Sequence, residues 1–336
     1  MAATLKDVAE LAGVSIATVS RVLNDPEKVA EGSRLKVMAA VEKLGYSSNL
    51  LAKSLRQDGL NAVYVLLPSL SDPYFAQMHQ AISDVLFSYG YLMLSAATEG
   101  SLELEQECLA KVRSLNPSGV LMYTAHPTVP EGWSSYLTEA PMLFLSGNRL
   151  VGEKKNMTAL SIDRRTIGAQ AAAYLWETGC RNFIYLCDGP KHLDGEYWAG
   201  IQSVAETNGG SCRLCFSSRS IEDAARELDK VLDPSAPAAD CVLTQSNLQA
   251  AGVLSALRAR GLAVPEQVSV MSFENTELAC LTTPQLSVIG PSSYQIGMIG
   301  TMELLNQISA QKGGQLRPNG TLDLKLIPRG STHARV

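Results

Sequence analysis

The residues best suited to chemistry do not form the set that a catalytic site needs. Four histidines are scattered through the 336 residues without the spacing of metal ligands: His79, His126, His192 and His333. The phosphate-cradling patterns GxxxxGK[ST] and GxGxxG are both absent from the sequence. No nucleophile and base stand together as a recognisable set, so we expect no enzyme, no cofactor and no metal site.

The seven cysteines are scattered through apolar segments, and Cys212 and Cys215 are the one close pair. A zinc site needs a second pair or nearby histidines, which the sequence lacks. We therefore expect reduced core thiols of the kind that cytosolic proteins carry. The sequence has no run of 18 apolar residues and no secretory signal. We expect a cytoplasmic protein without a membrane partner.

The first 58 residues show the pattern of three short helices. Thr4 and Asp7 predict a capping box at the start of a helix over 5–12, which Gly13 ends. Two further helices are expected over 16–23 and 33–44. This segment carries eight basic and seven acidic residues, whereas the whole chain has a net charge of −5. The pattern favours a DNA-binding helix-turn-helix, with a small helical interaction module as the alternative.

The string TLKDVAELAGVSIATVSRVLNDPEKV, followed by VEKLGY and NLLAKSL, resembles the N-terminal signature of the LacI/GalR family of bacterial transcriptional regulators. The resemblance implies that the second helix enters the major groove of DNA. Ile16 and Ala17 would then read bases through apolar contact with a thymine methyl group, and Arg21 would reach a guanine or a phosphate. Other residues would hold phosphates: Thr4, Ser15, Thr18, Ser20 and Asn24.

Residues 49–56 resemble the family's hinge helix, which folds when a dimer grips its operator. Leu51 would pack against its dimer mate, and Leu55 would wedge into a central base step from the minor groove. The chain departs from the family at Ser48, where proline is usual. The hinge residues expected to contact DNA are Asn49, Leu51, Ala52, Lys53, Leu55 and Arg56.

Beyond residue 59, apolar runs alternate with amphipathic stretches, which predicts two doubly wound parallel sheets. The expected strands are 62–68, 91–97, 119–123 and 141–145, then 183–187, 212–216, 241–244, 268–273 and 321–328. The expected helices are 74–89, 101–115 and 134–139, then 164–178, 198–208, 220–232, 247–260 and 292–311. The resemblance implies an α/β periplasmic-binding-protein-like architecture with a ligand cleft between its lobes.

The same resemblance sets the expected boundaries. A helix-turn-helix would span 1–46, a hinge 47–59, and an effector-binding and dimerisation domain 60–336. Within that domain, the first lobe would comprise about 60–161 and 292–320. The second lobe would comprise about 162–291 and 321–330.

The resemblance places eight residues at the cleft: Tyr74, Phe75, Ser146, Asp163, Tyr197, Trp198, Asn247 and Glu274. The family's usual arginine is missing, because the chain reads Tyr197-Trp198 before its Ala199-Gly200-Ile201 step. Asn247 and Glu274 stand where aspartates are usual, and Ser146 replaces an acidic residue. We therefore expect a more aromatic and less charged pocket.

These features predict a repressor that binds a palindromic operator as a homodimer, with an affinity that a small effector modulates. The effector expected is a sugar or a nucleoside. The alternative is a DNA-binding regulator with a degenerate pocket, which responds to a protein partner or to no small molecule.

Overall fold

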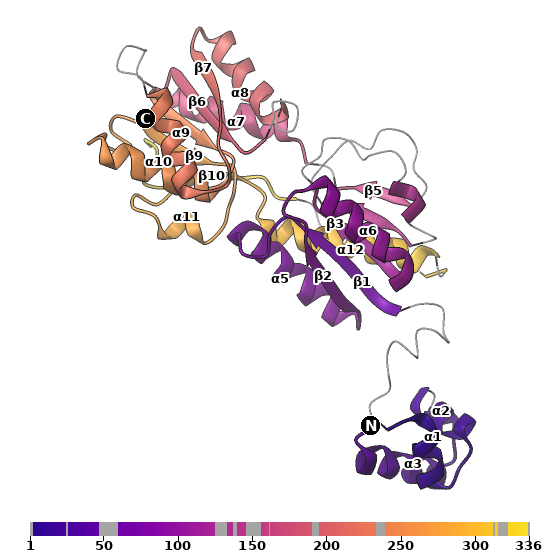
Figure 1. Cartoon of the computed structure of the whole chain (residues 1–336). Helices are drawn as coiled ribbons and strands as arrows, with labels where there is room; N and C mark the ends of the chain where they lie inside the picture. Colours follow the sequence, from indigo (N-terminus) through magenta and orange to yellow (C-terminus); the bar gives the residue numbers. More distant parts are fainter. Residues whose placement is uncertain are drawn as a thin grey trace. The chain divides into compact units, whose positions relative to one another are not determined.

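The computed structural model describes residues 3–24, 26–46, 60–124, 133–136, 140–145, 156–160, 162–189, 195–232, 239–311, 313–314 and 322–334. The chain divides into two compact units, Met1–Leu60 and Asn61–Val336 (Figure 1). Among the described helices, none has the length and apolar character needed to cross a membrane.

The first unit contains three α-helices around a small core. They are α1 (Leu5–Ala12), α2 (Ile16–Asn24) and α3 (Glu31–Leu44), with a 3-10 turn η1 (Pro26–Lys28) before α3. The capping box is confirmed, because the Thr4 hydroxyl accepts from the Asp7 N–H and the Asp7 carboxylate accepts from the Thr4 N–H. Gly13 ends α1 in the left-handed conformation, with φ of 66°. The core is formed largely by valines: Val8, Val19, Val22 and Val37.

The first lobe of the second unit combines α-helices with a five-stranded β-sheet. Its elements are β1 (Leu60–Leu67), α5 (Pro73–Ser88), β2 (Leu92–Ala97), α6 (Leu102–Leu115), β3 (Pro117–Met122), η2 (Trp133–Tyr136), β4 (Met142–Phe144) and β5 (Met157–Ala159). The strands lie in the order β2-β1-β3-β4-β5. Alternate residues of β1 enter different cores, since Val63 and Val65 pack with α5 while Tyr64 and Leu66 pack with α6.

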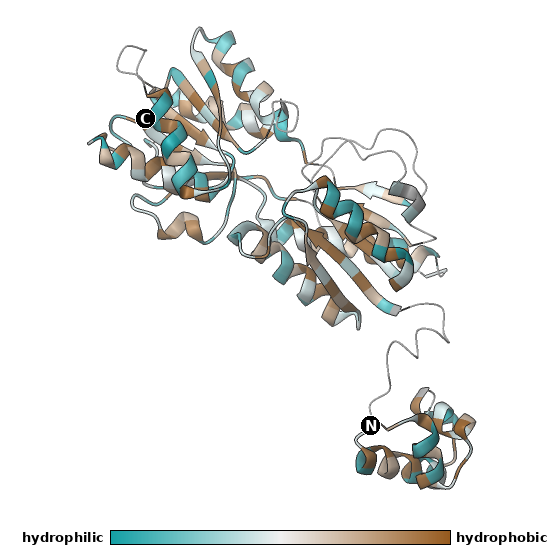
Figure 2. Ribbon diagram, viewed as in Figure 1, coloured by the Kyte–Doolittle hydropathy of each residue, from teal (hydrophilic) through white to brown (hydrophobic). Residues whose placement is uncertain are grey.

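The second lobe begins with α7 and contains a six-stranded sheet. Its elements are α7 (Arg164–Glu177), β6 (Asn182–Cys187), α8 (Gly195–Thr207), β7 (Ser211–Phe216), α9 (Ile221–Val231), β8 (Cys241–Thr244), α10 (Asn247–Ala259), β9 (Ser269–Ser272), α11 (Leu278–Leu281), β10 (Ser287–Gly290) and β11 (Lys325–Ile327). The strand order is β11-β10-β9-β8-β6-β7. Figure 2 shows apolar residues concentrated along the strands of both lobes.

The chain passes between the lobes near its C-terminal end. After β10, helix α12 (Ser293–Gln311) packs against α5 and β3 of the first lobe. The chain then returns to the second lobe as β11, which pairs antiparallel with β10. The expected parallel second sheet is confirmed, and β11 adds an antiparallel strand at its edge. Because β10 leaves the lobe and β11 re-enters from the same side, the returning strand runs in the opposite direction.

Three other expectations differ from the structure. The helix expected over 134–139 is a 3-10 turn over Trp133–Tyr136, and 137–139 lie outside the described residues. The strands β5 and β10, of three and four residues, were not predicted from the sequence. The final strand is shorter than expected, Lys325–Ile327 rather than 321–328.

Candidate functional site

Helix α2 presents an apolar first turn to solvent. The Ser15 hydroxyl accepts from the Thr18 N–H at 3.1 Å and so caps the start of the helix. Val19 and Val22 are buried in the core of the unit. Ile16, Ala17 and Arg21 are exposed, with Ile16 at 47% of its full surface. The face of α2 that avoids the core can therefore contact DNA through hydrocarbon at its start and through one guanidinium a turn later.

A pocket lies between the two lobes at the carboxyl ends of the strands. Four aromatic side chains line it, two from the first lobe and two from the second: Tyr74, Tyr123, Tyr197 and Phe273. Polar lining comes from Arg164, Arg219, Gln245 and Glu274. Burial raises the pKa of both Tyr74 and Tyr123, which keeps their phenol groups neutral.

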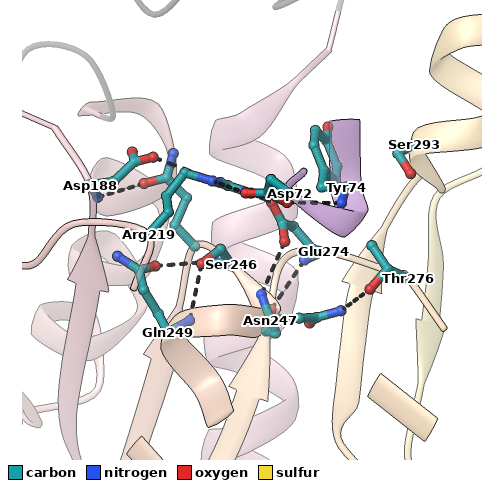
Figure 3. Close-up of polar contacts among 12 residues, drawn as sticks. Asp72, Tyr74, Asp188, Arg219, Ser246, Asn247, Gln249, Glu274, Thr276 and Ser293 are labelled. Atoms are coloured by element: carbon teal, nitrogen blue, oxygen red, sulfur yellow. Dashed lines mark hydrogen bonds and ion pairs between the residues drawn. The ribbon is translucent and has the colours of Figure 1, made fainter. Parts of the chain in front are cut away.

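Arg219 joins the two lobes across this pocket (Figure 3). It follows β7, and its Nε lies 2.8 Å from Oδ2 of Asp72, the residue that caps α5 in the first lobe. Its Nη2 is paired with Oε1 of Glu274, and its Nη1 lies 3.7 Å from Oδ2 of Asp188. The guanidinium also lies 5.7 Å from the ring centre of Tyr74. Arg219 is thus held by carboxylates from both lobes and by an aromatic ring.

Glu274 is the most deeply buried carboxylate of this cluster. Burial raises its pKa to about 7, an effect that the Arg219 guanidinium opposes and the Asp72 carboxylate adds to. The Asn247 N–H donates to the second carboxylate oxygen of Glu274 at 3.0 Å. Gln245 completes the polar wall, with its Oε1 accepting from the Asp188 N–H at 2.8 Å.

The sequence and the structure both resemble known regulators. Residues 4–49 match the model of bacterial regulatory proteins of the lacI family, and residues 172–332 match a periplasmic binding protein-like domain. The ribose operon repressor of Bacillus subtilis (strain 168) is 32% identical over 92% of this chain and 93% of its own length. The chain belongs to the lacI family.

Other relatives match this lacI-family protein over nearly its full length. The HTH-type transcriptional repressor CytR of Escherichia coli (strain K12) is 28% identical over 99% of this chain and 97% of its own. A LacI-family transcriptional regulator from Silicibacter pomeroyi has a TM-score of 0.80 at 25% identity, covering 98% of this chain and 99% of its own. The Lac repressor bound to ONPG has a TM-score of 0.82 at 23% identity, with 99% and 100% covered. These likenesses confirm the expected fold, and the family is one of transcriptional regulators rather than enzymes.

The structure brings together only some of the residues expected at the cleft of this lacI-family protein. Tyr74, Tyr197 and Glu274 line the pocket. Asn247 lies beneath Glu274, with its side-chain amide donating to the Thr276 hydroxyl at 2.7 Å. Ser146 lies outside the described residues.

Three of the expected cleft residues have evident structural roles. Phe75 is buried in the core of the first lobe, 4.9 Å from the ring of Tyr123, and its ring centre also lies 5.2 Å from the central carbon of the Arg219 guanidinium. Asp163 caps α7, accepting from the Thr166 N–H at 3.0 Å. Trp198 packs against the core of the second lobe. None of the three is among the residues that line the described pocket.

The expected DNA contacts fall into three groups. Ser15, Thr18 and Ser20 lie on or before α2, and the Thr4 hydroxyl is engaged with Asp7. Asn24 ends α2, but its side chain lies outside the described part. The expected hinge contacts all lie outside the described residues: Asn49, Leu51, Ala52, Lys53, Leu55 and Arg56.

The expectation of a pocket less charged than the family's stays a prediction, but the pocket does carry charge that the sequence analysis did not name. Arg219 comes from the loop after β7 and pairs with Asp72, Asp188 and Glu274. No motif marked Arg219 in the sequence. Its position just after a strand was the available signal, because ligands of such sheets bind at the carboxyl ends of strands.

Proposed function

We propose that this lacI-family repressor binds a palindromic operator as a homodimer and that a sugar- or nucleoside-sized effector in the interlobe pocket alters its operator affinity. The observation that carries the proposal is the composition of the pocket wall. Asp72 and Tyr74 come from the first lobe, whereas Arg219 and Glu274 come from the second. A ligand that contacts both walls changes the free-energy difference between the arrangements that the two lobes can adopt.

Relatives support the presence of an effector. Among the structural relatives, one is a complex of the transcriptional regulator CelR with cellobiose, and another is the Lac repressor bound to ONPG. Two sequence relatives are named ribose operon repressors. A coupling of about 1–3 kcal/mol between effector and operator would change operator affinity by roughly 5–150-fold.

Operator recognition is proposed to rest on α2. Ile16 and Ala17 have no hydrogen-bonding side-chain group, so they would read thymine methyl groups and the shape of the groove. Arg21 would add a guanine or phosphate contact. Leu55 of the hinge would wedge into a central base step from the minor groove.

Binding to both halves of a palindrome needs two helix-turn-helix units. The surface of the second unit supports a homodimer. Phe87 on α5 is 85% exposed and Leu281 on α11 is 77% exposed. Large apolar side chains this exposed are candidates for burial at an interface between copies. A structural relative, the Lac repressor, is described as a dimer bound to operator and the anti-inducer ONPF. Because its proposed target is operator DNA, we propose that the protein acts in the cytoplasm.

A regulator with no small effector is the second candidate. The observation that favours it is the small free space in the pocket, about 30 Å³. Binding of ligand to the native state raises the unfolding temperature by mass action. A thermal-shift screen with sugars and nucleosides therefore separates the two candidates, because the second predicts no shift.

The experiment that tests DNA binding is selection from a library of random duplexes with the purified full chain. We expect enrichment of a palindrome with a flexible central pyrimidine–purine step. Arg21→Ala and Leu55→Ala should weaken or abolish the enrichment. Lys43→Ala, at an exposed basic residue near the end of α3, is the matched control and should enrich the same palindrome. Enrichment of no palindrome by the wild type, with or without pooled sugars and nucleosides, would overturn the proposal.

A further inference from the structure

The centre of the pocket is filled by a side chain of the protein itself. The guanidinium of Arg219 stands between Asp72, Asp188 and Glu274 (Figure 3). The remaining space of about 30 Å³ holds water but no sugar ring. Pockets for drug-sized ligands measure roughly 300–1,000 Å³. A ligand of that size therefore does not fit beside Arg219 in this arrangement of the two lobes.

The surroundings of Arg219 have the chemistry of a site for an organic cation. Three carboxylates face one guanidinium, and the rings of Tyr74 and Phe75 lie 5.7 and 5.2 Å from its central carbon. Carboxylates pair with a cation, and aromatic faces attract it through the ring quadrupole. The other arginine of the pocket, Arg164, lies over the ring of Tyr197, 5.7 Å from its centre.

Displacement of Arg219 has different consequences for ligands of different charge. A neutral ligand would leave Asp72 and Glu274 without the guanidinium that now pairs with them, and both carboxylates are more than nine-tenths buried. Each carboxylate would then either stay charged without a partner or take up a proton, and both outcomes cost free energy. An anionic ligand would add repulsion from the same carboxylates. A cationic group restores the pairing that Arg219 provided.

We propose that the effector carries a guanidinium or ammonium group, and that it binds by taking the place of the Arg219 guanidinium between Asp72, Asp188 and Glu274. The inference rests on the proposed function, since it names the chemical class of the ligand at the same pocket. When the effector is absent, Arg219 then occupies the site and holds the two lobes together. Because Arg219 belongs to the same chain, it competes with the effector at a high effective concentration.

The test uses methylguanidinium and its uncharged analogue N-methylurea as probes of the full chain. Binding to Arg219→Ala is measured by calorimetry and thermal unfolding. We expect methylguanidinium to bind this variant at least tenfold more tightly than N-methylurea does. We also expect it to bind the wild type at least tenfold more weakly than the variant, because the tethered Arg219 competes. Arg219→Met, which keeps an apolar stem, serves as the second variant for the same comparison.

Matched controls separate charge recognition from the filling of a cavity. Arg226 on α9 is exposed and paired with Asp223, so Arg226→Ala should bind methylguanidinium as weakly as the wild type. Adding Glu274→Gln to Arg219→Ala should weaken methylguanidinium binding at least fivefold and leave N-methylurea binding unchanged. Equal binding of the two probes to both Arg219 variants would overturn the inference. So would stabilisation of the wild type by ribose, a neutral sugar, that Arg219→Ala leaves unchanged.

Operator selection on the same proteins keeps the two proposals distinguishable. If a palindrome is enriched but the charged and neutral probes bind equally, the cation inference fails and the repressor stands. If no palindrome is enriched but methylguanidinium is preferred, the cation site stands and the proposed repressor function fails.

Discussion

The proposed base-reading residues at the start of α2 offer hydrocarbon rather than hydrogen-bonding groups. Ile16 is well placed for contact, since it is 47% exposed and lies one residue after the capping Ser15. Glutamine at this position would present a donor and an acceptor, which match the major-groove edge of adenine. We expect Ile16→Gln to change the preferred base at one position in each operator half-site, towards adenine. Selection from random duplexes measures the change.

An exposed apolar residue outside α2 provides the control for that substitution. Leu11 on α1 is 45% exposed, close to the value for Ile16. Leu11→Gln should select the same operator as the wild type. If the two substitutions alter the preferred sequence alike, or if Ile16→Gln alters nothing, Ile16 is not a base-reading residue.

A second residue-scale prediction concerns Glu105, a carboxylate in the core of the first lobe. Glu105 is 0% exposed, and it accepts from the Thr124 hydroxyl at 2.9 Å. Burial raises its pKa from 4.5 to about 7, and the hydrogen bond from Thr124 opposes this in part. The folded state thus holds the proton more tightly than the unfolded state. The resulting stability is present below the unfolded pKa and is lost as the pH rises through about 7.

Glu105→Gln removes this titration. Between about pH 4 and about pH 8, we expect the unfolding free energy of the wild type to fall relative to that of Glu105→Gln, by up to about 3 kcal/mol. Urea unfolding across this pH range measures the difference. Glu103, exposed in the same helical turn, gives the control, and Glu103→Gln should follow the wild type. Parallel pH profiles for wild type and Glu105→Gln would show that the buried carboxyl has an ordinary pKa.

At the scale of elements, the pocket depends on the close packing of α7 and α8. A Cβ on Gly168 would collide with the carbonyl oxygen of Tyr197, and one on Gly200 with the carbonyl oxygen of Arg165. We expect Gly200→Ala to force the helices apart and to lower the unfolding free energy of the second unit by about 1–3 kcal/mol. Chemical denaturation measures this loss. Gly32→Ala is the control, since a Cβ there meets open space. An unchanged unfolding free energy in Gly200→Ala would contradict close packing at this crossing.

The sequence predicted most helices and strands but missed two short strands. The first two helices of the first unit begin at capping side chains, so α1 was predicted to the residue and α2 to within one. Helix α3 follows Ala30, which makes no side-chain cap, and its start was predicted two residues late. Strands β5 and β10 were missed because neither contains more than two consecutive apolar residues, whereas the equally short β4 lies in a longer apolar run. The antiparallel direction of β11 depends on where the chain re-enters the second lobe, which local pattern does not encode.

The same limit applies to the pocket. Tyr74 and Glu274 were predicted because the family resemblance places them at the cleft. Arg219 stands in a short polar loop, and its partner Asp72 lies in the other lobe, 147 positions away. Spacing within a sequence does not predict a pair so distant, because only the folded arrangement of the two lobes brings it together.

At the scale of the whole molecule, two exposed apolar side chains, one in each lobe, point to assembly. Phe87 and Leu281 have the largest exposed fractions of any large apolar residues in the part of the chain that the structure describes. In a two-fold symmetric interface, one substitution changes the surface twice. Fully burying a phenylalanine contributes roughly 1.5–3 kcal/mol, so losing two such contacts and adding two charges weakens a dimer strongly.

We therefore expect Phe87→Lys to raise the dissociation constant of the dimer at least tenfold, and Leu281→Lys to act in the same direction. Sedimentation equilibrium measures the assembly. Operator affinity should fall with it, because the two half-sites would then be bound by separate chains. Ile221→Lys, at a 45% exposed position on α9, should change neither quantity. A wild type that sediments as a monomer at micromolar concentration, or a Phe87→Lys variant that dimerises as tightly as the wild type, would place the interface elsewhere. If operator affinity fell while the dimer persisted, assembly and DNA binding would be separate properties. The two helix-turn-helix units would then be present but wrongly spaced for the half-sites.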